Sequence, residues 1–275
     1  MRSTRDPPSG QNTDVRPRLH VRILAAAAVA VALILPAGTP AIGTSAGALA
    51  HASNWLSTPA SVRERRVDLL RAGDFVSQRT DVACVGASVQ LMLNMIRPVA
   101  DRSASGQQLA QRTAQAMSDP VFVRRSGGAS ALGWAYALER LGGGPYRVRA
   151  FSSRTEALRA VATAIAATGR PAGLLVWAGV HAWVVSGFRS VGDPASDPAF
   201  RLVTLTVEDP WWPRQTNSHG RTLAPGTELT PDALTPHFVL YHRGRRGVGN
   251  LLNGSFVVVL PLDPAAVAER AAGLR

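Results

Sequence analysis

Residues 77–96, SQRTDVACVGASVQLMLNMI, decide the fold because a polar segment gives way there to an apolar one. Apolar side chains after the cysteine recur at the spacing of one helical face, at Val85, Val89, Met92 and Ile96. The pair Arg97-Pro98 then ends the pattern. We therefore expect a buried helix that begins near Cys84, with Asp81 as its N-cap.

Cys84 is the only cysteine of the chain. In the first turn of a helix, unpaired backbone N–H groups and the helix dipole favour the thiolate form of a cysteine. A thiol without a partner in its own chain is a buried small hydrophobe, an intermolecular link or a reactive group. The residues around Cys84 do not by themselves choose among these three.

The N-terminus has the layout of an export signal. Arginines precede the apolar run ILAAAAVAVALIL at 23–35, and Ala48 and Ala50 form an A-x-A cleavage signature. We therefore expect a secreted or cell-envelope protein. It divides into a basic cytoplasmic segment at 1–22, a signal peptide or membrane anchor at 23–50, and one domain at 51–275. In the anchored alternative, residues 23–43 hold the protein to the membrane.

The charge of the chain says little about its partners. The formal net charge is +12, and all 30 basic residues are arginine. No aromatic platform or nucleic-acid motif accompanies them, so we expect no nucleic-acid partner. We expect contact with a membrane only through the N-terminal segment, and the sequence leaves the oligomeric state open.

The exported part changes from helical to alternating apolar spacing along its length. Helices are expected near residues 61–72, 84–96, 106–117, 129–141 and 154–168. Strands are expected at 146–151, 172–177, 181–188, 201–208 and 255–260, with a possible further strand at 237–242. Helices first and strands later predict an α+β fold with a mainly antiparallel sheet, on which the helix of Cys84 packs.

A cysteine nucleophile needs a base, and the base needs a group that orients it. His181 opens the strand-like segment 181–188, and a polar loop joins that segment to 201–208. If the two form a hairpin, His181 lies opposite Glu208, and Asp209 leaves the sheet beside the imidazole. The proline that follows Asp209 ends the strand, so this corner can turn the carboxylate inward.

An oxyanion hole is expected from the residues just before the helix. Gln78 stands six residues before Cys84, and its side-chain amide can join the backbone N–H of Cys84 there. The chain has neither the H-E-x-x-H pattern of a metal hydrolase nor the G-x-S-x-G elbow of a serine hydrolase. We therefore expect no metal and no organic cofactor.

Three motifs together resemble the papain-like cysteine peptidases of the bacteriocin-processing (double-glycine) type and their stand-alone, exported relatives. The motifs are Q-x5-C before an apolar helix, HAWVVSGF at 181–188 and VEDP at 207–210. The resemblance spans about residues 84–209. It implies a papain-like fold and makes 51–275 a peptidase-like domain.

The resemblance also implies a role for each of four residues. Cys84 attacks, His181 is the general base, Asp209 orients the base, and Gln78 stabilises the oxyanion. Val85 follows the cysteine where the family commonly has glycine. The chain has no P-loop of a fused export ATPase, so cleavage of double-glycine leaders is not implied.

We therefore expect an extracytoplasmic cysteine peptidase that hydrolyses a peptide or protein substrate through a Cys-His-Asp triad and an acyl-enzyme. Trp183 and Trp211 are candidates for the substrate cleft, although tryptophans in sheets belong more often to the core. Two alternatives are an inactive papain-like binding module and an acyl or peptidyl transferase that uses the same triad.

Overall fold

The computed structural model describes residues 63–214, 216–217, 220–243 and 251–273. Contacts divide the chain into two units, Met1–Trp55 and Leu56–Arg275, and every described residue belongs to the second. The predicted signal or anchor at 23–50 lies outside the described residues. Within the described part, no helix is both long enough and apolar enough to cross a bilayer.

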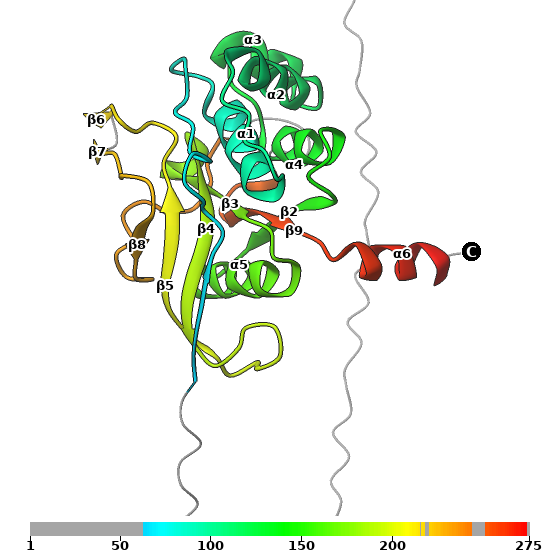
Figure 1. Cartoon of the computed structure of the whole chain (residues 1–275). Coiled ribbons are helices and arrows are strands. Elements are labelled where there is room, and N and C mark those ends of the chain that lie inside the picture. Colours follow the sequence, from blue (N-terminus) through cyan, green and yellow to red (C-terminus); the bar gives the residue numbers. More distant parts are fainter. Residues whose placement is uncertain (1–62, 215, 218–219, 244–250, 274–275) are drawn as a thin grey trace, which may run out of the picture. The chain divides into compact units, whose positions relative to one another are not determined.

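A seven-stranded sheet forms the centre of the described unit (Figure 1). Its order is β2-β9-β3-β4-β5-β8, and β1 pairs with the second half of β4. The strands are β1 (Glu64–Asp68), β2 (Tyr146–Phe151), β3 (Ala172–Val176), β4 (His181–Val191), β5 (Arg201–Glu208), β8 (Thr227–Leu229) and β9 (Phe256–Pro261). The short strands β6 (Thr216–Asn217) and β7 (Gly220–Arg221) form a separate pair. Every described pairing is antiparallel.

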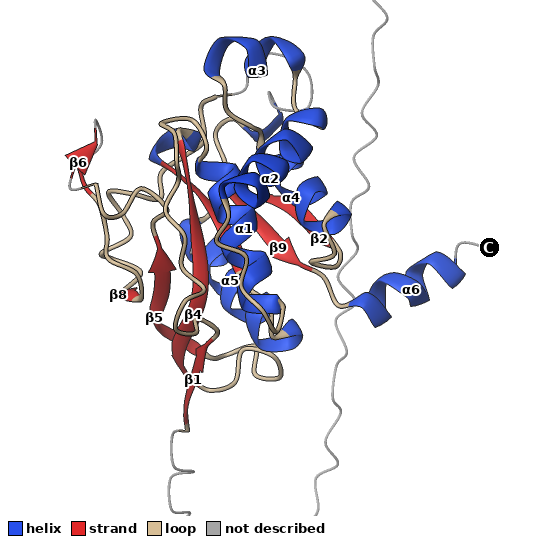
Figure 2. Cartoon of the chain, turned by 45° about the horizontal axis from the view of Figure 1, so that its top comes forward, coloured by secondary structure: helices blue, strands red, loops and turns tan. Residues whose placement is uncertain are grey.

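Helices cover both faces of the sheet (Figure 2). The helices of the described part are α1 (Cys84–Ile96), α2 (Ala104–Ala116), α3 (Pro120–Ser126), α4 (Ala131–Arg140), α5 (Arg154–Thr168) and α6 (Pro264–Gly273), of which α6 projects away from the sheet (Figure 2). One core joins α1 and α4 to Ala182 and Val184 of β4, and the other joins α5 to Trp183 and Val185. Successive residues of β4 thus enter opposite cores, as strand geometry requires. The predicted α+β fold, with the helix of Cys84 on an antiparallel sheet, is confirmed.

The helix of the sole cysteine is one of the most buried elements, since every residue from Val85 to Met95 is buried. Val85 is 2% exposed and packs in the core of α1 and α4, so its side chain is directed away from solvent. Gly86 is the position that needs a small residue: a Cβ there would lie 2.7 Å from the Cβ of Gln111 on α2. Valine directly after the cysteine is therefore compatible with a tightly packed helix.

Local sequence explains where the next helices begin. The side chains of Ser103, Ser130 and Ser153 accept hydrogen bonds from the first turns of α2, α4 and α5. The expected helices near 106–117, 129–141 and 154–168 are therefore confirmed, with small differences at their ends. The short helix α3, capped by Asp119, was not expected from the sequence.

Two of the expected elements are wrong. In the region of the expected helix at 61–72, the described residues form the strand β1, whose residues alternate between exposed and partly buried. Gly187 of β4 allows this pairing, because a Cβ there would lie 2.2 Å from the carbonyl oxygen of Val67. The possible strand at 237–242 is not a strand. Its residues instead hydrogen-bond the turn before β4 and the loop before β9.

The N-cap expected at Asp81 is also wrong. Ala83 holds that position, and no side chain caps the helix there. The Asp81 carboxylate is 82% exposed and accepts a hydrogen bond of 3.0 Å from the Arg214 guanidinium. Cys84 nevertheless occupies the first helical residue, so its place in the first turn is confirmed.

The register expected for the β4–β5 hairpin is wrong by three residues. Val184, not His181, lies opposite Glu208. The reason is that β4 continues three residues beyond Phe188, so that Val191 rather than Phe188 pairs with Arg201. One irregularity adds a residue on β4, between Val185 and Gly187, and the other adds one on β5, opposite Arg189 and Ser190, so the two cancel. His181 consequently lies beyond the end of the β5 pairing, on the part of β4 that pairs with β3.

Candidate active site

His181 and Asp209 meet at one end of the sheet. His181 is the first residue of β4, and Asp209 directly follows β5. The His181 Nε2–H donates a hydrogen bond of 2.8 Å to Asp209 Oδ1. The two side chains are 6% and 0% exposed. The pairing of β4 with β5 ends at Val184 and Glu208, so His181 lies beyond it. Asp209, the residue after Glu208, therefore reaches the imidazole from outside the paired part of the sheet.

Backbone groups complete the environment of the Asp209 carboxylate. Oδ1 also accepts a hydrogen bond of 2.9 Å from the Trp211 backbone N–H, and Oδ2 accepts one of 3.4 Å from that of Leu223. A buried carboxylate needs such hydrogen-bond donors. They fix the position of the Asp209 carboxylate against the imidazole.

The Cys84 thiol lies on the other side of the same imidazole. Cys84 and His181 are hydrogen-bonding partners, and the backbone N–H groups of Ala182 and Val85 also donate to the sulfur. Since Nε2 of the ring donates to Asp209, Nδ1 is the nitrogen that remains for the sulfur. The structure thus brings together the three residues that the sequence predicts as a triad.

The electrostatics of the site favour a thiolate and an imidazolium. Burial raises the pKa of Cys84, but hydrogen bonding and charge interaction with His181, together with the two N–H donors, bring it below its ordinary value. Burial lowers the pKa of His181, but the hydrogen bonds to Asp209 and Cys84 outweigh it and raise the pKa to about 9. The lowered thiol pKa and the raised imidazole pKa together favour a deprotonated sulfur beside a protonated imidazole.

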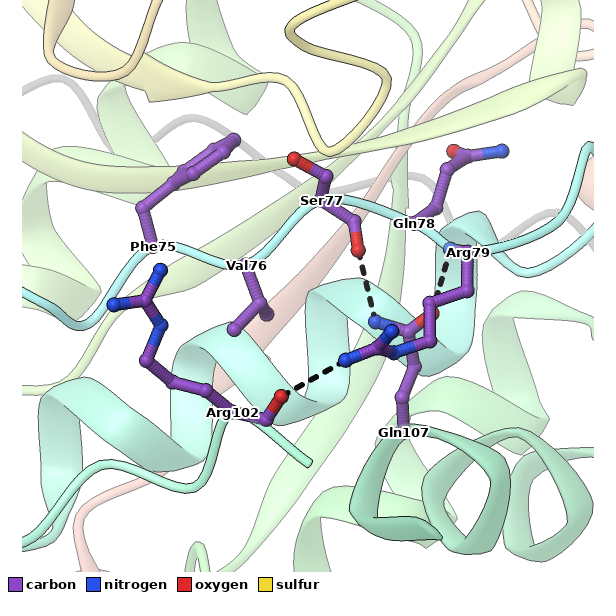
Figure 3. Close-up of a pocket in the computed structure, with 7 residues that line it drawn as sticks. All are labelled: Phe75, Val76, Ser77, Gln78, Arg79, Arg102 and Gln107. Carbon is purple, nitrogen blue, oxygen red and sulfur yellow. Dashed lines mark hydrogen bonds between the residues drawn. The ribbon is translucent and has the colours of Figure 1, made fainter. Parts of the chain in front are cut away.

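Gln78 lies on a loop that is fixed from two sides. Its backbone N–H donates a hydrogen bond of 2.7 Å to Pro210 O, which ties the loop to the corner after Asp209. On the opposite side, the Gln107 side-chain amide donates to Ser77 O at 3.0 Å and accepts from the Arg79 N–H at 2.8 Å (Figure 3). The Gln78 side chain is 3% exposed, and its Nε2 donates to Thr80 O at 2.8 Å. No described hydrogen bond joins Gln78 to Cys84, so its oxyanion role stays a prediction.

The two tryptophans expected at the cleft have different surroundings. Trp183 is fully buried in the core that α5 covers, so a cleft role for Trp183 is wrong. Trp211 is half-buried and lies edge-on to His181, with ring centroids 6.3 Å apart. Trp211 therefore stands at the site, and its contact with a substrate stays a prediction.

Sequence reasoning missed the contact that Trp177 makes with the base. The Trp177 indole stacks on the His181 ring at 5.2 Å between centroids and 13° between planes. Trp177 Nε1–H donates a hydrogen bond of 3.2 Å to Nδ1 of His237, a residue that carries no recognisable motif. Trp177 and Ala178 have φ values of 50° and 57°, an unfavourable conformation for non-glycine residues that the surrounding structure must enforce.

Within the described residues, no group of three or more His, Cys, Asp or Glu side chains is placed to hold a metal ion.

Comparisons with known proteins leave the family of the chain open. No protein-family model and no curated protein matches it. Eleven chains of solved structures match, among them "Crystal structure of UfSP from C.elegans". That match has a TM-score of 0.35 and 15% identity, and covers 69% of this chain and 32% of the other. The chain thus spans about a third of the length of the solved structure it matches. Membership of the bacteriocin-processing family stays a prediction.

We expect the ion pair to appear in the alkylation of Cys84, the sole thiol. Because the pKa of Cys84 is lowered, its rate of reaction with iodoacetamide will rise with pH through a midpoint below the ordinary value of about 8.5. In His181→Ala only the two backbone N–H donors counteract the effect of burial on the pKa of Cys84, so the alkylation midpoint will move to higher pH. Identical midpoints in the two proteins would contradict the pairing.

We expect Trp177 to stabilise the imidazolium by offering it an aromatic face. Trp177→Leu removes that face and will raise the alkylation midpoint of Cys84 by about one pH unit, whereas Trp177→Phe will raise it by less. Chemical denaturation of both variants identifies any general loss of folding. Equal shifts in the two variants would show that the aromatic face is not what matters.

Proposed function

We propose that this protein is a cysteine peptidase. The observation that carries the proposal is the buried chain of hydrogen bonds from Cys84 through His181 to Asp209. It supplies a nucleophile whose pKa is lowered, a proton donor beside it and a carboxylate that orients the donor. Cys84 is the first residue of α1, His181 is the first residue of β4, and Asp209 directly follows β5.

In the acylation step, the Cys84 thiolate adds to the carbonyl carbon of the peptide bond, and the carbonyl oxygen takes up the negative charge. The Cys84 backbone N–H, which has no partner within the helix, and Gln78 Nε2 receive this oxyanion. Gln78 Nε2 donates one of its two hydrogens to Thr80 O, so the second remains for this purpose. The C–N bond then breaks as the His181 imidazolium gives its proton to the leaving nitrogen.

In the deacylation step, neutral His181 takes a proton from water, and the resulting hydroxide attacks the thioester. Cys84 leaves as a thiolate, and the carboxylic acid product is released, which restores the ion pair. Asp209 keeps Nε2 protonated throughout and thus leaves Nδ1 to carry the proton. No cofactor takes part in these steps.

We further propose that the protein acts outside the cytoplasm, either released or held to the cell envelope through residues 23–43. The support is the order of basic, apolar and small residues in the first 50 positions. We also propose that the protein belongs to the bacteriocin-processing family, on the basis of the three sequence motifs.

Hydrolysis of a peptide mixture, followed by mass spectrometry of the products, tests the function. We expect Cys84→Ser and His181→Ala to lose nearly all activity, and Gln78→Ala to lower kcat by about 10²–10³-fold. Gln108→Ala, which changes an exposed glutamine of α2, is the matched control and will keep full activity. Addition of an amine acceptor separates hydrolysis from transfer, since a transferase forms the amide product.

A folded protein that cleaves no peptide and transfers no acyl group, although its Cys84 is ionised, would support the binding module instead. Full activity in Cys84→Ser would remove Cys84 from the mechanism altogether.

A further inference from the structure

A cavity of about 330 Å³ lies beside the proposed oxyanion residue. Its walls are formed by the extended segment Phe75–Arg79, by Arg102 before α2 and by Gln107 on α2 (Figure 3). Gln78 lines this cavity and also hydrogen-bonds the corner that follows Asp209. Gln78 therefore connects the cavity to the candidate active site, and the volume of the cavity suits one or two residues of a bound peptide.

The cavity carries uncompensated positive charge. Arg79 and Arg102 line it, and none of its lining residues is acidic. Nη2 of Arg79 donates a hydrogen bond of 3.0 Å to Arg102 O. This bond holds the Arg79 side chain against the backbone of Arg102. Elsewhere in the described part, Arg65, Arg71 and Arg214 each pair with a carboxylate. Arg79 and Arg102 form no such ion pair with any described residue.

Gln78 adds an unused hydrogen-bond acceptor. Its Oε1 is buried and has no hydrogen-bond partner among the described residues. The orientation of the amide is fixed, because Nε2 donates to Thr80 O and a flipped amide would place two oxygens against each other. A buried acceptor of this kind is normally satisfied by a donor.

The floor of the cavity is already built before any ligand binds. Gln107 is buried and bonds the backbone on both sides of Gln78, at Ser77 O and at the Arg79 N–H. Its Nε2 also donates to Gln90 Oε1 at 3.1 Å within α1. This network fixes Gln78 and the start of the Arg79 side chain, so a ligand need order only the outer part of one arginine.

We propose that this cavity binds a carboxylate of the substrate peptide, from an acidic side chain or a free C-terminus, close to the bond that is cleaved. The carboxylate pairs with Arg79 or Arg102, whose guanidinium groups lie at opposite ends of the lining residues (Figure 3). The inference rests on the proposed peptidase function and names the class of substrate that the same site prefers.

Paired peptides test the preference. Each peptide found to be cleaved is resynthesised with Glu or Gln at each of four positions around the scissile bond, with a free or an amidated C-terminus. We expect kcat/KM to be about tenfold higher for the acidic member at one position. A preference for the glutamate side chain under an amidated end, or for the free end alone, identifies the source of the carboxylate.

Arginine variants connect the preference to the cavity. In Arg79→Gln/Arg102→Gln the ratio of acidic to neutral kcat/KM will fall toward one, whereas in Arg112→Gln, an exposed arginine of α2, it will be unchanged. High salt will weaken the preference in the unmodified protein, because the arginines are exposed. An acidic preference that survives the double substitution, or equal cleavage of both members at every position, would overturn the inference.

A binding measurement separates this inference from the peptidase proposal. Fluorescence anisotropy of the labelled Glu and Gln peptides is measured with Cys84→Ala protein, with and without the two arginine substitutions. Tighter, arginine-dependent binding of the Glu peptide without cleavage by the unmodified protein would support the carboxylate site and reject the peptidase. Competition by inorganic phosphate with no difference between the two peptides would reject the site as a peptide subsite.

Discussion

The hydrogen bond between His181 and Asp209 is the interaction on which the rest of the site depends. Both side chains are buried, and a charged pair at such a place is unfavourable unless fixed dipoles and counter-charges surround it. The surroundings provide them: backbone N–H groups donate to Asp209, and the Cys84 sulfur faces the other side of the imidazole. Burial alone would favour the neutral forms of both His181 and Cys84. His181 and two backbone N–H donors oppose this for Cys84, and Asp209 and Cys84 oppose it for His181.

The chain after Asp209 holds this arrangement in place. Pro210 O accepts from the Gln78 N–H, which brings the oxyanion loop to the same corner as the carboxylate. His237 O accepts a hydrogen bond of 2.8 Å from the Trp177 backbone N–H, and its ring accepts from the Trp177 indole. The resemblance to the double-glycine peptidases leaves 211–253 without a role. The described part of this region acts as a scaffold for the turn that presents His181.

The sequence predicted the candidate site best where a residue type has one main chemical role. A single cysteine at the start of an apolar run, a histidine at the start of a strand and an Asp-Pro corner identified the three residues that meet in the structure. The three residues meet although the expected register is wrong, because the prediction of the triad required only that the ends of β4 and β5 lie close together. The register depends on how far β4 continues beyond Phe188, where it pairs with both β1 and β5, so local alternation could not predict it.

Other features depended on partners far away in the chain. β1 is a strand only because β4 offers it an edge and Gly187 lets the backbones approach, whereas its sequence alone suits a helix. Trp183 and Trp177 are both tryptophans of strand-like segments, so the sequence does not distinguish them. Trp183 nevertheless belongs to the core, whereas Trp177 stacks on His181. Nothing in the sequence near His237 indicates its contact with Trp177. Likewise, nothing near Asp81 indicates its ion pair with Arg214.

The protonation state of His181 in the free protein tests the central claim most directly, and nitrogen-15 NMR of the imidazole measures it. The account predicts that both ring nitrogens carry protons at pH 7 and that the ring titrates at about 9. His181→Gln assigns the signals, and Cys84→Ala will lower that pKa. A ring that is neutral at pH 7 and titrates near the ordinary value of about 6.5 would contradict the ion pair and the mechanism that depends on it.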